Sequence, residues 1–127
     1  MQNRINYLQT VIASQRSPIE VFMGMQQEPN SALIIDVRIG NPAFLKEKIN
    51  DALEIPLTEL HANLDKLDKN KLIYVSTWNY GCNLAKQASL ILLSNGFNVM
   101  EIAGGNENWK ATGLPMVELE QNEVEHD

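Results

Sequence analysis

Cysteine is almost absent from the sequence: the chain of 127 residues contains one, Cys82. A single cysteine excludes an internal disulfide framework and a cysteine-rich metal site. Histidine is scarce as well, and the two histidines, the acids and the cysteine do not cluster at the spacing of metal ligands. The sequence also lacks a phosphate-binding loop and a dinucleotide fingerprint. It therefore predicts no bound metal and no cofactor.

Long hydrophobic runs and an excess of positive charge are missing too. No window reaches the length of a membrane span, and the N-terminus lacks the apolar core and cleavage site of a signal peptide. The net charge is −6, which is the opposite of the footprint of a nucleic-acid-binding domain. We therefore expect a cytoplasmic protein that binds neither membranes nor nucleic acid.

The apolar residues that are present predict an α/β domain. Hydrophobic residues make up 44% of the chain, enough for one core in a domain of this length. Three apolar runs without a helical period predict buried strands at residues 32–37, 71–76 and 97–103. A brief edge strand is expected just before Pro56. Because helical segments separate these strands, the sheet should be mostly parallel.

Helices are predicted by their apolar spacing and their end signals. Ile5, Leu8 and Ile12 have the spacing of a short amphipathic helix, and residues 83–95 predict a longer one that ends at a glycine. Ser17 begins another helix with a capping box, since Glu20 follows three residues later. Further short helices are expected within residues 38–48 and at residues 107–113. Thr58 is expected to cap another helix, whose apolar side is formed by the leucines at 57, 60, 64 and 67.

A polar loop, residues 77–83 (Thr-Trp-Asn-Tyr-Gly-Cys-Asn), separates the second strong strand from the next helix. Ligands of parallel α/β sheets bind beyond the carboxyl ends of the strands, so this loop is the expected site. Backbone N–H groups at the start of the helix favour negative charge, and a thiol placed there becomes a better nucleophile. Cys82 is therefore a candidate nucleophile. The alternative is a small buried residue that packs the loop.

The other polar and aromatic residues near the loop leave alternatives open. Ser76 and Thr77 carry hydroxyls, but a hydroxyl nucleophile needs an adjacent base. His61 borders the leucine face of a helix and the other histidine lies in the C-terminal tail, so capping and turn hydrogen bonds are the expected roles of both hydroxyls. Trp78 and Tyr80 either line a pocket or contact surface, or fold back onto the domain.

The order of motifs resembles the rhodanese-like domain over residues 17–117. IIDVR, which ends at Arg38, is similar to the Asp-x-Arg signature of the family's first strand, and KEKINDALEIP has the hydrophobic placement of its GHIPGAINIP segment. GFNVMEIAGGNENWKATGLPMV, residues 96–117, closely resembles the closing pattern of Gly-Phe, a strand, Gly-Gly, Trp and Gly-x-Pro. The resemblance implies a single rhodanese-like domain with a mostly parallel central sheet flanked by helices on both faces.

The same resemblance bears on the chemistry of the loop. Rhodanese-like enzymes carry a sulfur atom as a persulfide on a loop cysteine, while the loop amides hold the sulfur and an anionic donor such as thiosulfate. STWNYGCN is similar to the subgroup pattern Y-C-W-G-P-G-C-N, with matches at Trp78, Gly81, Cys82 and Asn83. Thr77 stands at the position of the catalytic cysteine, and the usual loop arginine is missing. The resemblance therefore implies that ordinary thiosulfate sulfurtransferase activity is absent.

Two further departures from the family pattern reduce the number of reactions that the resemblance allows. Lys48, Asn50 and Asp51 replace the histidine, the proline and the second glycine of the GHIPGA segment. Asn83 stands where the longer loop of the related phosphatase branch needs an arginine. The sequence therefore predicts no phosphatase activity.

Two functions follow from these residues. The first is a degenerate rhodanese-like domain that acts as a binding or regulatory module, with Trp78 and Tyr80 as contacts to a protein partner. The second is a sulfurtransferase that carries a persulfide on Cys82, with a small sulfur donor or anion held by the 77–83 loop. Asp36 and Arg38 are expected to orient the loop in either case.

The domain organisation follows from the same boundaries. Residues 1–16 are predicted to form an N-terminal helical extension, and residues 17–117 the rhodanese-like domain. Residues 118–127 are predicted to form an acidic, disordered tail.

Overall fold

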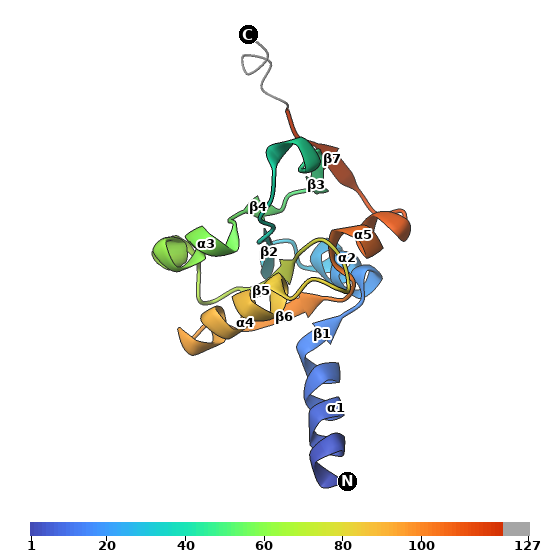
Figure 1. The fold of residues 1–127 in the computed structure, drawn as a ribbon, viewed down its shortest axis with the longest axis vertical. Helices are drawn as coiled ribbons and strands as arrows, with labels where there is room; N and C mark the ends of the chain where they lie inside the picture. The colour runs from blue at the N-terminus through green and yellow to red at the C-terminus, as the bar shows by residue number, and fades with distance from the viewer. Residues whose placement is uncertain (121–127) are drawn as a thin grey trace.

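The predicted strands form the centre of a parallel sheet. The computed structural model describes residues 1–120, and the last seven residues of the predicted tail lie outside them. The sheet has five strands in the order β1-β6-β5-β2-β4, and every pairing within it is parallel (Figure 1). The strands are β1 (Gln15–Arg16), β2 (Ala32–Asp36), β4 (Leu53–Glu54), β5 (Leu72–Ser76) and β6 (Val99–Ile102). The predicted α/β fold is thus confirmed.

Helices cover both faces of this sheet. They are α2 (Pro18–Gln27) and α5 (Gly105–Ala111) on one face, and α3 (Leu57–Leu60), the 3₁₀ helix η2 (His61–Lys66) and α4 (Leu84–Ser94) on the other. Side chains of successive strand residues point to opposite faces of the sheet, so each central strand contributes side chains to two hydrophobic cores. In β5, Ile73 and Val75 pack toward α4, while Tyr74 packs toward α2 and α5.

The predicted helix starts are right at one position and wrong at another. Ser17 caps α2 as predicted, with its hydroxyl accepting from the Glu20 N–H and the Glu20 carboxylate accepting from the Ser17 N–H. Thr58 does not cap α3, because the helix begins one residue earlier and its cap position is Pro56, without a side-chain hydrogen bond. The leucine-bearing helix is also short, since it tightens into η2 after Leu60.

A small antiparallel pair was not predicted. The segment expected to hold a short helix forms the 3₁₀ helix η1 (Pro42–Phe44) and then strand β3 (Glu47–Ile49). β3 pairs with β7 (Met116–Glu118), near the end of the described chain. Strands of three residues are too short to show an alternating pattern, so the sequence offered no signal for them.

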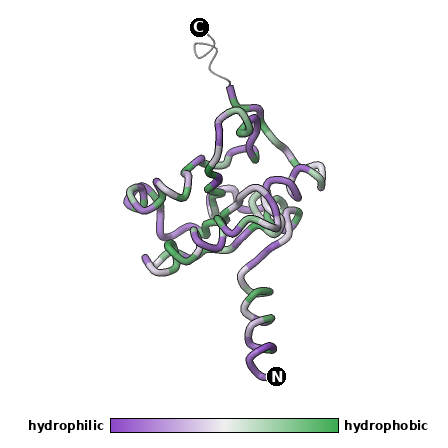
Figure 2. Tube along the Cα trace, viewed as in Figure 1, coloured by the Kyte–Doolittle hydropathy of each residue, from purple (hydrophilic) through white to green (hydrophobic). Residues whose placement is uncertain are grey.

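The N-terminal extension is the helix α1 (Gln2–Ser14), which projects away from the rest of the domain (Figure 1). Its apolar residues are visible as hydrophobic turns along that projection (Figure 2). Within the described structure none of the α1 residues is buried. No helix among residues 1–120 is long and apolar enough to cross a membrane.

Candidate functional site

The loop between β5 and α4, residues 77–83, begins at the carboxyl end of a central strand, as predicted. Asn79 organises it as an Asx-type turn: its side-chain Oδ1 accepts from the Gly81 N–H at 2.9 Å, and its carbonyl accepts from the Cys82 N–H at 3.2 Å. Two amide groups of the loop are therefore used in holding the loop itself together.

The two candidate nucleophile positions meet within this loop. Cys82 Sγ lies 3.1 Å from Thr77 Oγ1, and either atom can donate the hydrogen bond. Thr77 is 1% exposed, whereas Cys82 is half-buried. The turn at Asn79 folds the far end of the loop back onto its start, which brings together two residues that are five positions apart.

The loop is fastened to α5 through its backbone. The amide N–H groups of Asn106 and Glu107 donate to the carbonyls of Thr77 and Trp78 at 2.7 and 3.0 Å. This close approach requires Gly105, because a Cβ at that position would lie 2.4 Å from the Thr77 carbonyl oxygen. Gly105 also has a φ of +62°, which L-residues with a side chain rarely adopt. The Gly-Gly turn at the start of α5 thus positions the loop.

A buried polar network lies beneath the loop. Arg38 forms an ion pair with Asp36 at 2.8 Å, and its Nε donates to both oxygens of the same carboxylate at 2.9 Å. Asn106 donates from Nδ2 to Asp36 Oδ2 at 3.2 Å and accepts from the Ser76 hydroxyl at 2.6 Å. Arg38 also donates to the Glu47 carbonyl at 2.8 Å, so the network ties β2, β3, β5 and α5 together.

The buried network contains Asp36 and Arg38, which were predicted as supporting residues, together with residues that the sequence did not indicate. Asp36 and Arg38 are 3% and 5% exposed, which fits residues that hold the loop from below. Asn106 was not predicted as a residue of the site. Ser76 was expected to bond within its turn, but its hydroxyl donates instead to a side chain 30 residues away.

The two loop aromatics behave differently. Trp78 folds back onto the domain: the Arg38 guanidinium lies 4.7 Å from its ring centre, and its indole N–H donates to the Ile39 carbonyl at 3.3 Å. Tyr80 is 70% exposed, and its hydroxyl accepts from the Asn108 amide at 3.2 Å. Tyr80 is thus the more exposed of the two loop aromatics.

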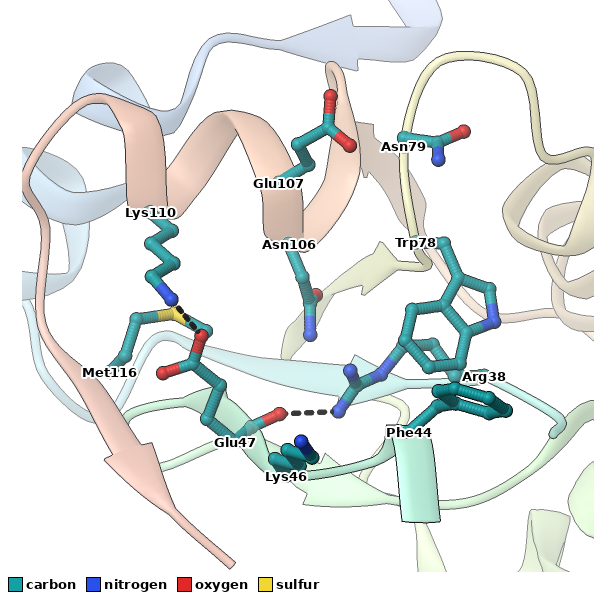
Figure 3. Close-up of a pocket in the computed structure, with 10 residues that line it drawn as sticks. All are labelled: Arg38, Phe44, Lys46, Glu47, Trp78, Asn79, Asn106, Glu107, Lys110 and Met116. Atoms are coloured by element: carbon teal, nitrogen blue, oxygen red, sulfur yellow. Dashed lines mark hydrogen bonds and ion pairs between the residues drawn. The ribbon is translucent and has the colours of Figure 1, made fainter. Parts of the chain in front are cut away.

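A pocket of about 260 Å³ opens beside the loop, between β3, α5 and Trp78 (Figure 3). Its lining has mixed charge: it includes the cations of Arg38, Lys46 and Lys110 and the carboxylates of Glu47 and Glu107. Lys110 forms an ion pair with Glu47 (Figure 3). The described residues that line the pocket include Trp78 and Asn79 of the loop but neither Thr77 nor Cys82.

His61 is an exposed residue at the start of η2. Among residues 1–120, no group of three or more histidine, cysteine or acidic side chains could hold a metal ion.

The model of the rhodanese-like domain family matches residues 19–112. This chain belongs to the rhodanese-like domain family. The match spans the buried network, the loop and the Gly-Gly turn just described, which confirms the family suggested by the sequence. A search of curated proteins found no match.

Solved structures show the same rhodanese-like fold. A full-length protein from Lactobacillus plantarum is 32% identical, with a TM-score of 0.87 over 93% of this chain and 98% of that one. The rhodanese-like domain of the Alr3790 protein from Anabaena is 26% identical, with a TM-score of 0.71 over 84% of this chain and 80% of that one. The BH2092 protein from Bacillus halodurans is 20% identical, with a TM-score of 0.77 over 98% of this chain and 96% of that one, and this likeness concerns the fold alone.

Proposed function

We propose that this rhodanese-like domain acts as a binding or regulatory module and does not carry out ordinary thiosulfate sulfur transfer. The proposal rests on the position and the burial of Thr77. By its place in the loop, Thr77 stands where the family's catalytic cysteine is expected, and it is 1% exposed. A hydroxyl cannot form a persulfide, and this one faces Cys82 Sγ within the loop.

The charges near the loop support the same function. An anionic sulfur donor needs a free cationic group, and the 77–83 loop contains none. Arg38 lies below the loop, but its guanidinium is bound to the Asp36 carboxylate and the Glu47 carbonyl. The adjacent pocket is lined by the cations of Lys46 and Lys110 and by the carboxylates of Glu47 and Glu107, and Lys110 is paired with Glu47. The loop itself thus offers no free cationic group for a doubly charged anion such as thiosulfate.

A protein partner fits the surface beside the loop. Tyr80 and Phe44 are 70% and 71% exposed, and exposed aromatics near a pocket are typical anchors of protein–protein contacts. The pocket offers paired charges and amides around Trp78 for polar contacts at the rim. In this proposal Trp78 has a structural role as the wall of the pocket, and Tyr80 is the contact residue.

A second candidate function is a persulfide carrier that uses Cys82. The contact between Cys82 Sγ and Thr77 Oγ1 favours it, because the sulfur points toward the position of the family's nucleophile. In this reaction the Cys82 thiolate attacks the outer sulfur of thiosulfate, the S–S bond of the donor breaks, and sulfite leaves with the electron pair. The Thr77 hydroxyl can stabilise the thiolate by donating a hydrogen bond.

Sulfur transfer from thiosulfate to cyanide tests the main proposal. We expect the wild-type protein to form thiocyanate no faster than buffer, and Thr77→Cys to form it measurably, because the restored thiol sits in a loop that keeps the family's backbone. Thr77→Ser is the matched control, since it keeps a hydroxyl at the same position. Catalysis by the wild-type protein above the rate in buffer would contradict the binding-module proposal.

A further inference from the structure

Arg38 keeps one nitrogen of its guanidinium free although the side chain is almost fully buried. Its Nε donates to both oxygens of the Asp36 carboxylate at 2.9 Å. Its Nη2 contacts Asp36 Oδ2 and donates to the Glu47 carbonyl, both at 2.8 Å. These contacts use every donor of Nε and Nη2. Within residues 1–120, no atom accepts a hydrogen bond from the remaining nitrogen, Nη1.

Nη1 opens into the pocket beside the loop. Among residues 1–120, no buried side-chain nitrogen or oxygen lacks a hydrogen-bond partner, so the unpaired Nη1 lies at accessible surface. Arg38 is 5% exposed, and it lines the pocket of about 260 Å³ between β3, α5 and Trp78 (Figure 3). Nη1 is therefore the part of Arg38 that a ligand in this pocket would meet.

The guanidinium is held in place on its other sides. The Asp36 carboxylate and the Glu47 carbonyl fix two of its edges. The Trp78 ring packs over its face, with 4.7 Å between the guanidinium carbon and the ring centre. A donor that is fixed before binding loses little conformational entropy when a ligand arrives. Nη1 is thus a preorganised donor and not a mobile surface charge.

Two further donors line the same pocket. Lys46 is exposed and takes part in none of the ion pairs formed within residues 1–120. The Asn79 side chain accepts from the Gly81 N–H through Oδ1, and none of the described residues accepts from its Nδ2. Guanidinium, ammonium and amide N–H groups all donate to carboxylate oxygens, and the charged donors form the stronger bonds.

The charges of the pocket fit a ligand with one negative charge. Arg38 is already paired with Asp36, and Lys110 is paired with Glu47. Lys46 is therefore the cation of the lining that an incoming anion could neutralise. A carboxylate brings one charge to Lys46, whereas a dianion brings a second charge with no cation left to compensate it.

The size and the walls of the pocket suit one small residue. Pockets for drug-sized ligands measure about 300–1,000 Å³, and this pocket, at about 260 Å³, is smaller. Trp78, Phe44 and Met116 contribute apolar side chains to its lining, which suit the carbon atoms next to a carboxylate.

We propose that this pocket binds a single carboxylate of the protein partner, with Arg38 Nη1 and the Lys46 ammonium as its donors. The inference rests on the proposed binding function and gives that function a ligand class. The carboxylate belongs to a chain end or to an acidic side chain, since both present the same oxygens. Arg38 then has two roles: one edge of its guanidinium holds Asp36, and the free Nη1 meets the ligand.

An NMR titration of the full chain, labelled with nitrogen-15, tests the proposal through its two tryptophans. Trp78 lines the pocket, whereas Trp109 is 2% exposed in the core beneath α2, so its indole signal is an internal reference. N-acetylglycine is the probe for a chain end, and the α-amide of N-acetylaspartate is the probe for an acidic side chain.

We expect the Trp78 indole signal to shift saturably with at least one probe, with a Kd on the order of 1 mM, while the Trp109 signal stays in place. The probe that binds more tightly identifies the source of the carboxylate. N-acetylglycinamide, which lacks the carboxylate, should leave the Trp78 signal unchanged. Sulfate at the same ionic strength should shift it less than the carboxylate probes do.

Variants at the two donors test which groups bind. Lys46→Gln removes the unpaired cation at an exposed position, so it should fold as the wild type does and bind the preferred probe about two- to fivefold more weakly. Lys66→Gln is the matched control, because Lys66 is an exposed lysine of η2 on the other face of the sheet, and it should bind as the wild type does. Arg38→Lys keeps a cation beside Asp36 but lacks Nη1, and it should lose the Trp78 shift.

Three results would overturn the proposal: no saturable Trp78 shift with either probe, an equal shift with N-acetylglycinamide or sulfate, or wild-type affinity in Lys46→Gln. The binding-module proposal is tested separately by thiocyanate formation, in which neither probe takes part. A wild-type protein that forms no thiocyanate and binds no carboxylate would refute the ligand class alone and leave the binding-module proposal standing.

Discussion

Cys82 Sγ and Thr77 Oγ1 lie 3.1 Å apart at the two ends of one loop. The contact joins the chain's single cysteine to Thr77, the residue that the sequence resemblance assigns to the family's nucleophile position. It makes the hydroxyl of Thr77 a neighbour of the only thiol in the protein.

The reactivity of Cys82 should depend on that hydroxyl. A hydrogen bond to a charged group contributes about 1.5 kcal/mol, so a hydroxyl that donates to the attacking sulfur can speed its reaction. We expect Thr77→Val to lower the rate of Cys82 alkylation by iodoacetamide at neutral pH by about three- to tenfold. Thr77→Ser should react like wild type, since it keeps the donor. Equal rates for the valine and serine variants would mean that the hydroxyl does not stabilise the thiolate.

The Asp36–Arg38 pair should be required for stability. Both side chains are almost fully buried, so Asp36→Ala leaves the Arg38 charge without its partner. Breaking a buried pair in this way costs about 3–5 kcal/mol of unfolding free energy. Urea denaturation of the wild type, Asp36→Ala and Arg38→Met measures this cost. A loss of less than about 1 kcal/mol of unfolding free energy in Asp36→Ala, which is the scale of a surface ion pair, would contradict this prediction.

Two glycines should respond oppositely to alanine. At Gly105 the new Cβ meets the Thr77 carbonyl and the backbone has a positive φ, so Gly105→Ala should destabilise the fold by more than the roughly 1–2 kcal/mol of a left-handed residue alone. At Gly24, inside α2, nothing lies within 4 Å, and Gly24→Ala should stabilise by about 0.5–1 kcal/mol. Thermal denaturation of both variants shows whether the two changes in Tm have opposite signs. Two changes in Tm of the same sign would refute this prediction.

The capping box at the start of α2 should make stability depend on pH. The Ser17 hydroxyl and then the Ser17 backbone N–H bond to the Glu20 carboxylate and lower its pKa below the ordinary value of 4.5. A carboxyl with a lowered pKa in the folded state contributes stability above its unfolded pKa and loses it as pH falls through the folded value. Glu20→Ala should therefore lower Tm at pH 7, and the difference from wild type should shrink as the pH falls below 4.5. A difference independent of pH would exclude the charge of Glu20 as its cause.

Much of the fold could be predicted because it is encoded locally. The strands around Ile34, Tyr74 and Met100 are short, mostly apolar runs, and the capping box of α2 depends on residues three positions apart. The prediction of a helix cap at Thr58 was wrong because the start of a helix also depends on the residues before it, here Pro56. The β3–β7 pair depends on residues 69 positions apart, such as Lys48 and Val117, and three-residue strands carry no periodic signal.

The candidate site was predictable only in part for a related reason. The loop could be placed at a strand end, and Asp36 and Arg38 could be named from a motif. The contacts of Asn106 with Ser76 and Asp36 cross 30 and 70 positions and arise only when α5 packs against the loop. The contact between Thr77 and Cys82 depends on how Asn79 turns the backbone, which residue types alone do not specify.

Intact-mass spectrometry after incubation with thiosulfate tests the central claim most directly. The binding-module account predicts no added sulfur atom on the wild-type protein or on Cys82→Ser, while Thr77→Cys gains one that reductant removes. A sulfur atom gained by the wild type, removed by reductant and absent from Cys82→Ser, would contradict that account and establish Cys82 as a persulfide carrier.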